Sequence, residues 1–316
     1  MVLDQIVNQR IIEKKAKLDK LRPLSPALVA RLRDQIIIEW TYNSNAIEGT
    51  KLSLKETELV IEDGLTINGI SMKDHLEAIN HKEAILFVEE LVKNRKPKLT
   101  SLLIRQIHQL IMNKIDKDNA GKYREVQVKI TGASYNLPFP VQIPIKMRAF
   151  EKWLWDRKNQ RNVIDFASIA HYKLVNIHPF VDGNGRTARL LMNLILINRG
   201  FSPTVILKTE RAKYYQTLRL ADKGNNKPFV DFIGNCVERS LTWYLDAVLP
   251  EKEKKYQEKW LVLSELAKKV NFSQEYLSLL ARRGRIEAVK KGRNWYSNLE
   301  AVQKYVKEID QILHQK

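Results

Sequence analysis

The sequence lacks paired cysteines, long apolar runs and an acidic balance, and each absence excludes a class of protein. Its one cysteine, Cys236, cannot form an internal disulfide, and we interpret it as a small buried hydrophobe. No apolar run approaches the length of a membrane span. Residues 1–20 are charged and lack the apolar region of a signal peptide. We therefore expect a cytoplasmic protein of a bacterium or archaeon, with no membrane partner.

Basic residues are in clear excess. Lysine and arginine outnumber aspartate and glutamate by 54 to 36, so the 316-residue chain has a formal net charge of +18. This charge favours anionic partners, namely nucleic acid, nucleotides or acidic protein surfaces, although it also serves general solubility. The length allows two or three structural units, and 44% hydrophobic residues are ordinary for a globular protein with a core.

Hydrophobic periodicity predicts a mainly α-helical protein. Ser25 and Pro26 are typical of a helix start, because serine caps a helix and proline fits its first turn. Gly49 is the expected terminator of the same helix. Along the first 250 residues, helices are expected at 1–24, 26–48, 53–63, 74–93, 101–113, 150–160, 165–176, 182–199, 211–224 and 229–249.

Residues 121–144 differ from the helical stretches around them. Val126, Val128 and Ile130 alternate with polar residues, which is the period of a strand. Two prolines close behind cannot continue a central strand. This stretch predicts a short β-hairpin on an otherwise helical protein.

The histidines outside one loop show no metal-binding pattern. His75, His81 and His108 are scattered, with no acidic or cysteine partners at the spacing of metal ligands, and we interpret them as ordinary helix residues. His171 precedes His178 by two helical turns, and we interpret it as a packing residue.

The stretch from His178 to Arg189 carries the strongest functional pattern. Gly183 and Gly185 allow the backbone to curl, and the N–H groups at a helix start favour an anion. Arg186 and Arg189 are three residues apart, so on a helix they share a face and can reach two phosphates. These residues predict a cradle for a nucleotide triphosphate.

Two titratable side chains complete this loop. Asp182 is an oxygen ligand suited to the Mg²⁺ that accompanies phosphates. His178 can accept a proton near neutral pH. Each residue alone is compatible with a plain turn and a structural histidine, but such a turn has no need of the whole set.

These residues resemble the signature of the Fic family, His-Pro-Phe-x-[Asp/Glu]-Gly-Asn-Gly-Arg-x-x-Arg, at every specified position. The resemblance implies an enzyme that transfers AMP from ATP to a protein hydroxyl, with His178 as the base and Asp182 on Mg²⁺. Doc-type kinases of the same superfamily depart from this pattern. The implied fold is a Fic-type helical bundle with a β-hairpin flap. The flap would hold the target protein's segment by strand addition.

The resemblance also implies the ATP-binding residues. Tyr214 and Tyr215 stand where family members place aromatic residues against adenine. Asp222 replaces an asparagine of several relatives, which puts its contact in doubt. The full implied set comprises Ile130, Thr131, Gly132, Ala133, Asp182, Gly183, Asn184, Gly185, Arg186, Thr187, Ala188, Arg189, Tyr214, Tyr215 and Asp222.

A second family motif precedes the loop. Ser44 to Gly49 is similar to the Fic inhibitory motif, [Ser/Thr]-x-x-x-Glu-[Gly/Asn]. Ser44 and Glu48 would lie one turn apart on a helix. The resemblance implies that Glu48 pairs with Arg189, and an arginine held by a carboxylate cannot also clamp the γ-phosphate. The motif is short, and the plain alternative is a surface glutamate before a helix-ending glycine.

Residues 260–316 resemble a winged helix-turn-helix module, a common companion of Fic domains. Helices are expected from Leu263, at 274–283 and at 299–313, with a wing formed by 286–289 and 294–296. One interpretation is DNA or RNA binding, and the alternative is protein docking or a homodimer. The residues expected on nucleic-acid phosphates are Arg282, Arg283, Lys290, Lys291 and Arg293.

The sequence thus divides into an N-terminal helical region (1–99) that contains the inhibitory motif, a Fic core (100–250), a linker (251–259) and the C-terminal module (260–316). We expect an autoinhibited protein adenylyltransferase that uses ATP and Mg²⁺ and modifies a Ser, Thr or Tyr hydroxyl of a target protein and of itself. Two alternatives remain: the same site removing AMP, and a DNA-binding regulator whose Fic portion senses nucleotide.

Overall fold

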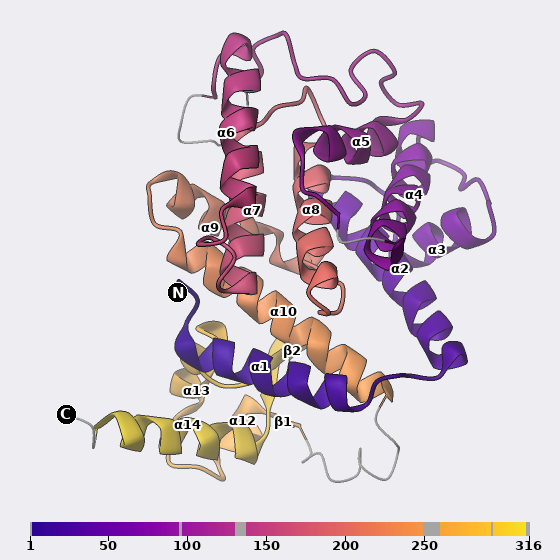
Figure 1. Cartoon of the computed structure of the whole chain (residues 1–316). Helices are drawn as coiled ribbons and strands as arrows, with labels where there is room; N and C mark the ends of the chain where they lie inside the picture. The colour runs from indigo at the N-terminus through magenta and orange to yellow at the C-terminus, as the bar shows by residue number, and fades with distance from the viewer. Residues whose placement is uncertain (1, 95–96, 130–136, 249–259, 292, 314–316) are drawn as a thin grey trace.

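A computed structural model describes residues 2–94, 97–129, 137–248, 260–291 and 293–313 (Figure 1). The protein is mainly α-helical, as predicted. The helices of the first 248 residues are α1 (Gln5–Lys20), α2 (Pro26–Glu48), α3 (Leu54–Glu62), α4 (Met72–Asn94), α5 (Ser101–Met112), α6 (Ile143–Trp155), α7 (Val163–Ile177), α8 (Asn184–Asn198), α9 (Arg211–Asp222) and α10 (Lys227–Val248).

Helix α8 lies at the centre of the molecule. Leu191 and Ile195 belong to a core shared with α1, α6, α7, α9 and α10, whereas Leu190 and Leu194 belong to a second core shared with α2 to α5. A helix that is apolar on several sides must be buried, and almost every residue of α8 is. Helix α8 therefore packs against both groups of helices, and its position is fixed by both cores.

The predicted ends of α2 are confirmed. The Ser25 hydroxyl accepts the N–H of Leu28 at 3.4 Å, and Pro26 is the first helical residue. Gly49 ends the helix with a φ of 110°, a left-handed conformation that glycine adopts without strain. The inhibitory motif therefore forms the last turn of a 23-residue helix.

Two predictions around residue 140 are wrong. No strand forms at 126–129, the part of the expected first strand that the structure describes, while Ile130 to Ala133 lie outside the described residues. The helix expected at 150–160 is α6, which begins at Ile143 and ends at Trp155. Pro144 stands in its first turn, where the missing N–H of proline costs nothing. The stretch expected to form the hairpin, 121–144, therefore runs into the first turn of α6.

The C-terminal module has its own small core and a three-stranded antiparallel sheet in the order β1-β3-β2. The wing strand expected at 294–296 forms as part of β3, whereas the one expected at 286–289 begins only at Val289, and β1 was not predicted. The expected linker, 251–259, lies outside the described residues. The elements are β1 (Leu261–Val262), α12 (Leu263–Ala267), α13 (Gln274–Arg282), β2 (Val289–Lys291), β3 (Asn294–Ser297) and α14 (Leu299–Leu313).

Charged residues of α1 join this module to the helical body (Figure 1). Arg10 forms a buried bidentate pair with Glu238 of α10, with both N–O distances at 2.8 Å. Arg10 also donates to the Gly284 carbonyl at 2.7 Å. Asp4 pairs with Arg285 of the module at 2.9 Å. Helix α1 is therefore fixed to both parts.

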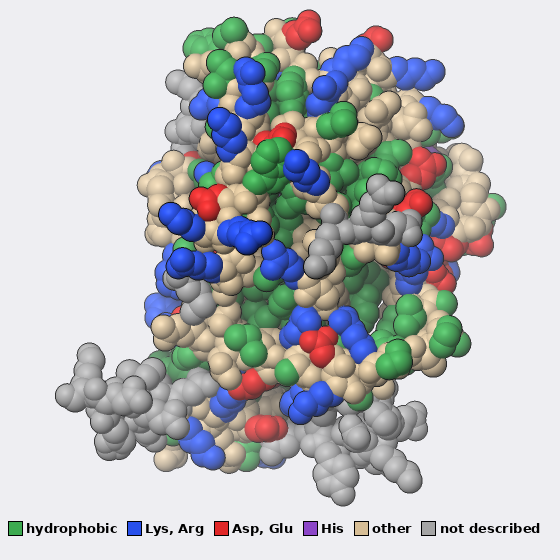
Figure 2. Space-filling model, viewed as in Figure 1, with side chains coloured by type: hydrophobic (Ala, Val, Ile, Leu, Met, Phe, Trp, Pro, Cys, Tyr) green, Lys and Arg blue, Asp and Glu red, His purple; other side chains and the backbone are tan. Residues whose placement is uncertain are grey.

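Basic side chains do not gather into one patch on the face seen in Figure 2. Figure 2 shows Lys and Arg side chains scattered over the viewed face, with acidic and apolar side chains between them. None of the described helices is both long enough and apolar enough to cross a bilayer.

Candidate active site

The loop from His178 to Gly183 joins α7 to α8 and is ordered by its own side chains. Asn184 accepts the Phe180 N–H at 3.0 Å and donates to the Phe180 carbonyl at 2.9 Å. Gly183 precedes α8 with a φ of 76°. The first turn of an α-helix leaves N–H groups without partners inside the helix, so the start of α8 can receive an anion.

His108 of α5 supports the loop, although the loop pattern did not single it out. The His108 ring stacks on Phe180 with centroids 3.7 Å apart, and its Nε2 donates to the Asp182 carbonyl at 2.9 Å. The tautomer is set because His108 Nδ1 accepts the N–H of Gly121. Burial lowers the pKa of His108 to about 4, so the ring is neutral near pH 7. His108 is therefore a structural support and was wrongly taken for an ordinary helix residue.

Arg124 ties the loop to the segment before it. Its Nε donates to the His178 carbonyl at 2.8 Å, and its Nη2 donates to the Pro138 carbonyl at 2.6 Å. Its own N–H donates to the Pro179 carbonyl at 2.9 Å. Arg124 ends the Gly-Lys-Tyr-Arg stretch that matches the family pattern, and its position explains why an arginine stands there.

His178 lies at the junction of α7 and the loop. Its N–H donates to the Leu174 carbonyl at 3.0 Å, and its φ of 50° places it in the left-handed region. Burial lowers the pKa of His178 to about 4, although a backbone contact with Val175 opposes this shift. The imidazole is therefore neutral at physiological pH and able to accept a proton.

Arg189 is held by the last turn of α2, in the contact that the motif predicts. Its Nη2 donates to Glu48 Oε1 at 2.7 Å and to the Ser44 carbonyl at 2.8 Å. Its Nε donates to the Ser44 hydroxyl at 3.0 Å. Burial alone would lower the pKa of Arg189, but the Glu48 carboxylate outweighs burial and raises it. The guanidinium is charged, buried and already paired.

Arg186 is also buried and also lies against carboxylates. Its Nη1 lies 3.1 Å from Glu77 Oε1, and its Nη2 lies 3.6 Å from Asp182 Oδ2. Glu77 belongs to α4, and nothing in the hydrophobic pattern marks it. The two arginines share a face of α8, as predicted, but each faces its own carboxylate.

Asp182 is the exposed carboxylate of the loop. Burial would raise its pKa, but Arg186 and the N–H of Gly183 outweigh that effect and lower it. Lys73 lies 3.8 Å from the same carboxylate. No set of three or more His, Cys, Asp and Glu side chains able to hold a metal occurs among the residues that the structure describes. A single charged carboxylate fits Mg²⁺ only where phosphates supply further ligands.

The two tyrosines of α9 have different environments. Tyr214 is buried, and its hydroxyl lies 3.0 Å from His171 Nε2, which agrees with a packing role for His171. Tyr215 is partly exposed, and its hydroxyl donates to Glu48 Oε2 at 3.4 Å. Asp222 accepts from Asn176, two residues before His178, at 3.4 Å. Tyr215 is therefore the better placed of the two for a nucleotide.

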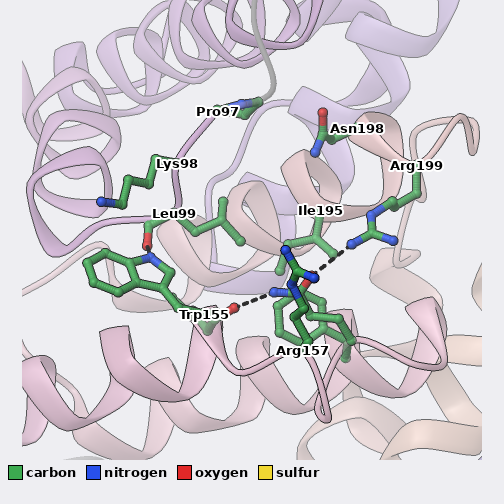
Figure 3. A pocket seen from close by; sticks show the side chains of 11 residues that line it. Pro97, Lys98, Leu99, Trp155, Arg157, Ile195, Asn198 and Arg199 are labelled. Carbon is green, nitrogen blue, oxygen red and sulfur yellow. Dashed lines mark hydrogen bonds between the residues drawn. The ribbon is translucent and has the colours of Figure 1, made fainter.

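A pocket of about 250 Å³ lies at the other end of α8, lined by residues that include Ile195 and Asn198. Figure 3 shows the guanidinium groups of Arg157 and Arg199 on one side of this pocket and the Trp155 indole on the other. Because α8 has 15 residues, its two ends are about 20 Å apart. This pocket is therefore separate from the loop at His178.

The chain is similar to known proteins of one family. The profile of the Fic/DOC family matches residues 98–196. The solved structure of Fic-1 (residues 134–508) from C. elegans is 33% identical, with a TM-score of 0.68, over 77% of this chain and 72% of that one. A Fic-domain signaling protein from Bacteroides thetaiotaomicron is 28% identical, with a TM-score of 0.71, over 76% of this chain and 97% of that one.

A protein adenylyltransferase Fic from Aedes aegypti is 36% identical over 244 residues, which cover 77% of this chain and 48% of the relative. The helical fold and the sequence of the loop define a protein of the Fic class. The chain belongs to the Fic family. It spans about half the length of the curated relatives it matches.

Proposed function

We propose that this protein is an autoinhibited adenylyltransferase, which transfers AMP from ATP to a Ser, Thr or Tyr hydroxyl of a target protein and of itself. One observation carries the proposal above the others: a neutral, half-buried His178 stands at the start of a loop that leads into the N-terminus of α8, and Arg189 of that helix is already occupied by Glu48. The names of the curated relatives support the same activity.

In the proposed reaction, the N–H groups at the start of α8 hold the α- and β-phosphates, and Arg189 orients the γ-phosphate once it is free. His178 takes the proton of the target hydroxyl. The hydroxyl oxygen then attacks the α-phosphorus, the bond to the β-phosphate oxygen breaks, and pyrophosphate leaves. Asp182 would hold Mg²⁺, which neutralises phosphate charge when bound.

Other expected residues keep proposed roles of different kinds. Tyr215 would contact adenine, while Ile130 to Ala133 would border the adenosine from the flap. Arg186, because it is buried against Glu77, would act by supporting Asp182 and the loop rather than by clamping a phosphate. The division into an N-terminal inhibitory region, a Fic core and a C-terminal module is part of the same proposal.

Inhibition follows from competition for one guanidinium. While Glu48 occupies Arg189, the γ-phosphate lacks its partner and the α-phosphorus is not aligned with the attacking oxygen. Glu48→Gly should therefore raise auto-adenylylation, measured with ATP labelled at the α-phosphate. Glu62→Gly is the matched control, since Glu62 is the last residue of α3 as Glu48 is of α2, and it should behave like the parent.

His178→Ala in the Glu48→Gly background should bind ATP and transfer no AMP. The proposal fails if Glu48→Gly binds ATP as the parent does and still labels neither itself nor any protein in a lysate. Release of AMP from labelled Glu48→Gly protein on adding the parent would instead favour the reverse reaction.

A further inference from the structure

The last turn of α2 is fastened to α4 at one residue, Glu77. The Thr50 hydroxyl donates to Glu77 Oε2 at 2.6 Å, and the Asn45 side-chain amide donates to the Glu77 carbonyl at 3.1 Å. All three residues are buried. Thr50 and Asn45 stand on either side of Glu48 in the sequence, so these two bonds flank the inhibitory carboxylate.

The same carboxylate reaches the active loop. Glu77 Oε1 lies 3.1 Å from Arg186 Nη1, and the Arg186 side chain is buried. Glu48 and Glu77 therefore each hold one of the two arginines in the N-terminal half of α8. Glu77 differs from Glu48 because it also contacts the chain that carries the other carboxylate.

The hydrogen bond from Thr50 to Glu77 is the contact between the end of α2 and α4 that a single substitution can remove. Gly49 reverses the chain with a φ of 110°, and the Thr50 N–H donates back to the Asn45 carbonyl at 3.2 Å. Helix ends fray unless their last groups are held. A hydrogen bond from Thr50 to a buried carboxylate is of the strong, charge-assisted kind, and without it the turn that aims Glu48 has one fewer anchor.

We propose that Glu77 is a positioning residue for inhibition: through Thr50 it holds the last turn of α2 in the place from which Glu48 reaches Arg189. This inference rests on the proposed adenylyltransferase activity. It assigns to α4 a part in setting the resting state of the loop, and it makes inhibition depend on two carboxylates rather than one.

The test is Thr50→Val, which keeps the shape of the side chain and removes the hydroxyl. We expect auto-adenylylation to rise roughly tenfold above the parent, the factor expected from losing a hydrogen bond to a charged group, and to stay below that of Glu48→Gly. Thr50→Ser keeps the hydroxyl and should remain as silent as the parent. ATP affinity and thermal midpoint are measured for each variant, so that only folded proteins are compared.

The decisive comparison is made in the Glu48→Gly background, because this variant lacks the inhibitory carboxylate that the bond from Thr50 to Glu77 would position. Thr50→Val should then change activity by less than twofold. Equal gains in both backgrounds, or no gain in the parent, would overturn the role of Glu77. Silence of Glu48→Gly itself would overturn the adenylyltransferase proposal instead, so the two failures are distinguishable.

Discussion

The lowered pKa of His178 predicts an unusual dependence of the reaction on pH. Burial of the ring lowers the pKa of His178 to about 4, whereas a histidine in water titrates near 6.5. The base must be neutral to accept the proton of the target hydroxyl. The Glu48→Gly variant is the suitable enzyme, because the Glu48 charge raises the pKa of His178 and its removal cannot bring that pKa back towards 6.5.

The size of the effect follows from the two pKa values. At pH 5.5, a histidine with a pKa of 6.5 is neutral in roughly a tenth of the molecules. With a pKa of about 4, nearly all His178 rings are still neutral at that pH. The transfer rate at saturating ATP should therefore change less than twofold between pH 7.5 and 5.5, where an ordinary histidine base would lose about tenfold.

The assay is the initial rate of AMP incorporation into the Glu48→Gly protein, measured at several pH values with excess ATP and Mg²⁺. ATP affinity is determined at each pH as a control, since a phosphate has a pKa near 6 of its own. A tenfold fall with an apparent pKa near 6.5, at unchanged ATP saturation, would contradict the burial argument for His178.

Two further predictions concern stability and nucleotide contact. Arg10→Met removes the bidentate partner of the buried Glu238 carboxylate, which keeps Lys14 at 3.2 Å, and should cost about 1.5–3 kcal/mol of unfolding free energy in urea denaturation. The double variant Arg10→Met/Glu238→Leu should recover part of this, and no recovery would argue against a charge effect. Tyr215→Ala should weaken ATP binding by about 1–3 kcal/mol in calorimetry with little change in stability. Tyr214→Ala should instead lower the unfolding free energy by about 3–5 kcal/mol. Unchanged ATP affinity of Tyr215→Ala would refute its contact with adenine.

Local sequence signals predicted the helical fold well. Ser25, Pro26 and Gly49 determine the ends of α2 through groups that lie within the same few residues. The start of α6 was misplaced because the whole stretch up to Pro144 was interpreted as a hairpin, although a proline also fits the first turn of a helix. Only the packing of Ile143 and Met147 into the core decides between them.

The candidate site was predictable as far as motifs extend. The contact of Glu48 with Arg189 joins residues 141 positions apart, and it was predicted because both belong to recognisable patterns. Glu77 and His108 carry no such pattern. Each is a polar residue on a helix whose partner is chosen by how α4 and α5 pack on α8, and a single sequence does not record that packing.

The backbone of His178 has a consequence beyond its side chain. A residue other than glycine with a φ of 50° carries local strain of about 1–3 kcal/mol, and the fold retains that strain at the one position that must accept a proton. The reversal of the main chain places His178 between α7 and α8, and the backbone contact with Val175 helps to orient its ring. The position of His178 relative to the N-terminus of α8 therefore does not depend on whether Glu48 is paired with Arg189.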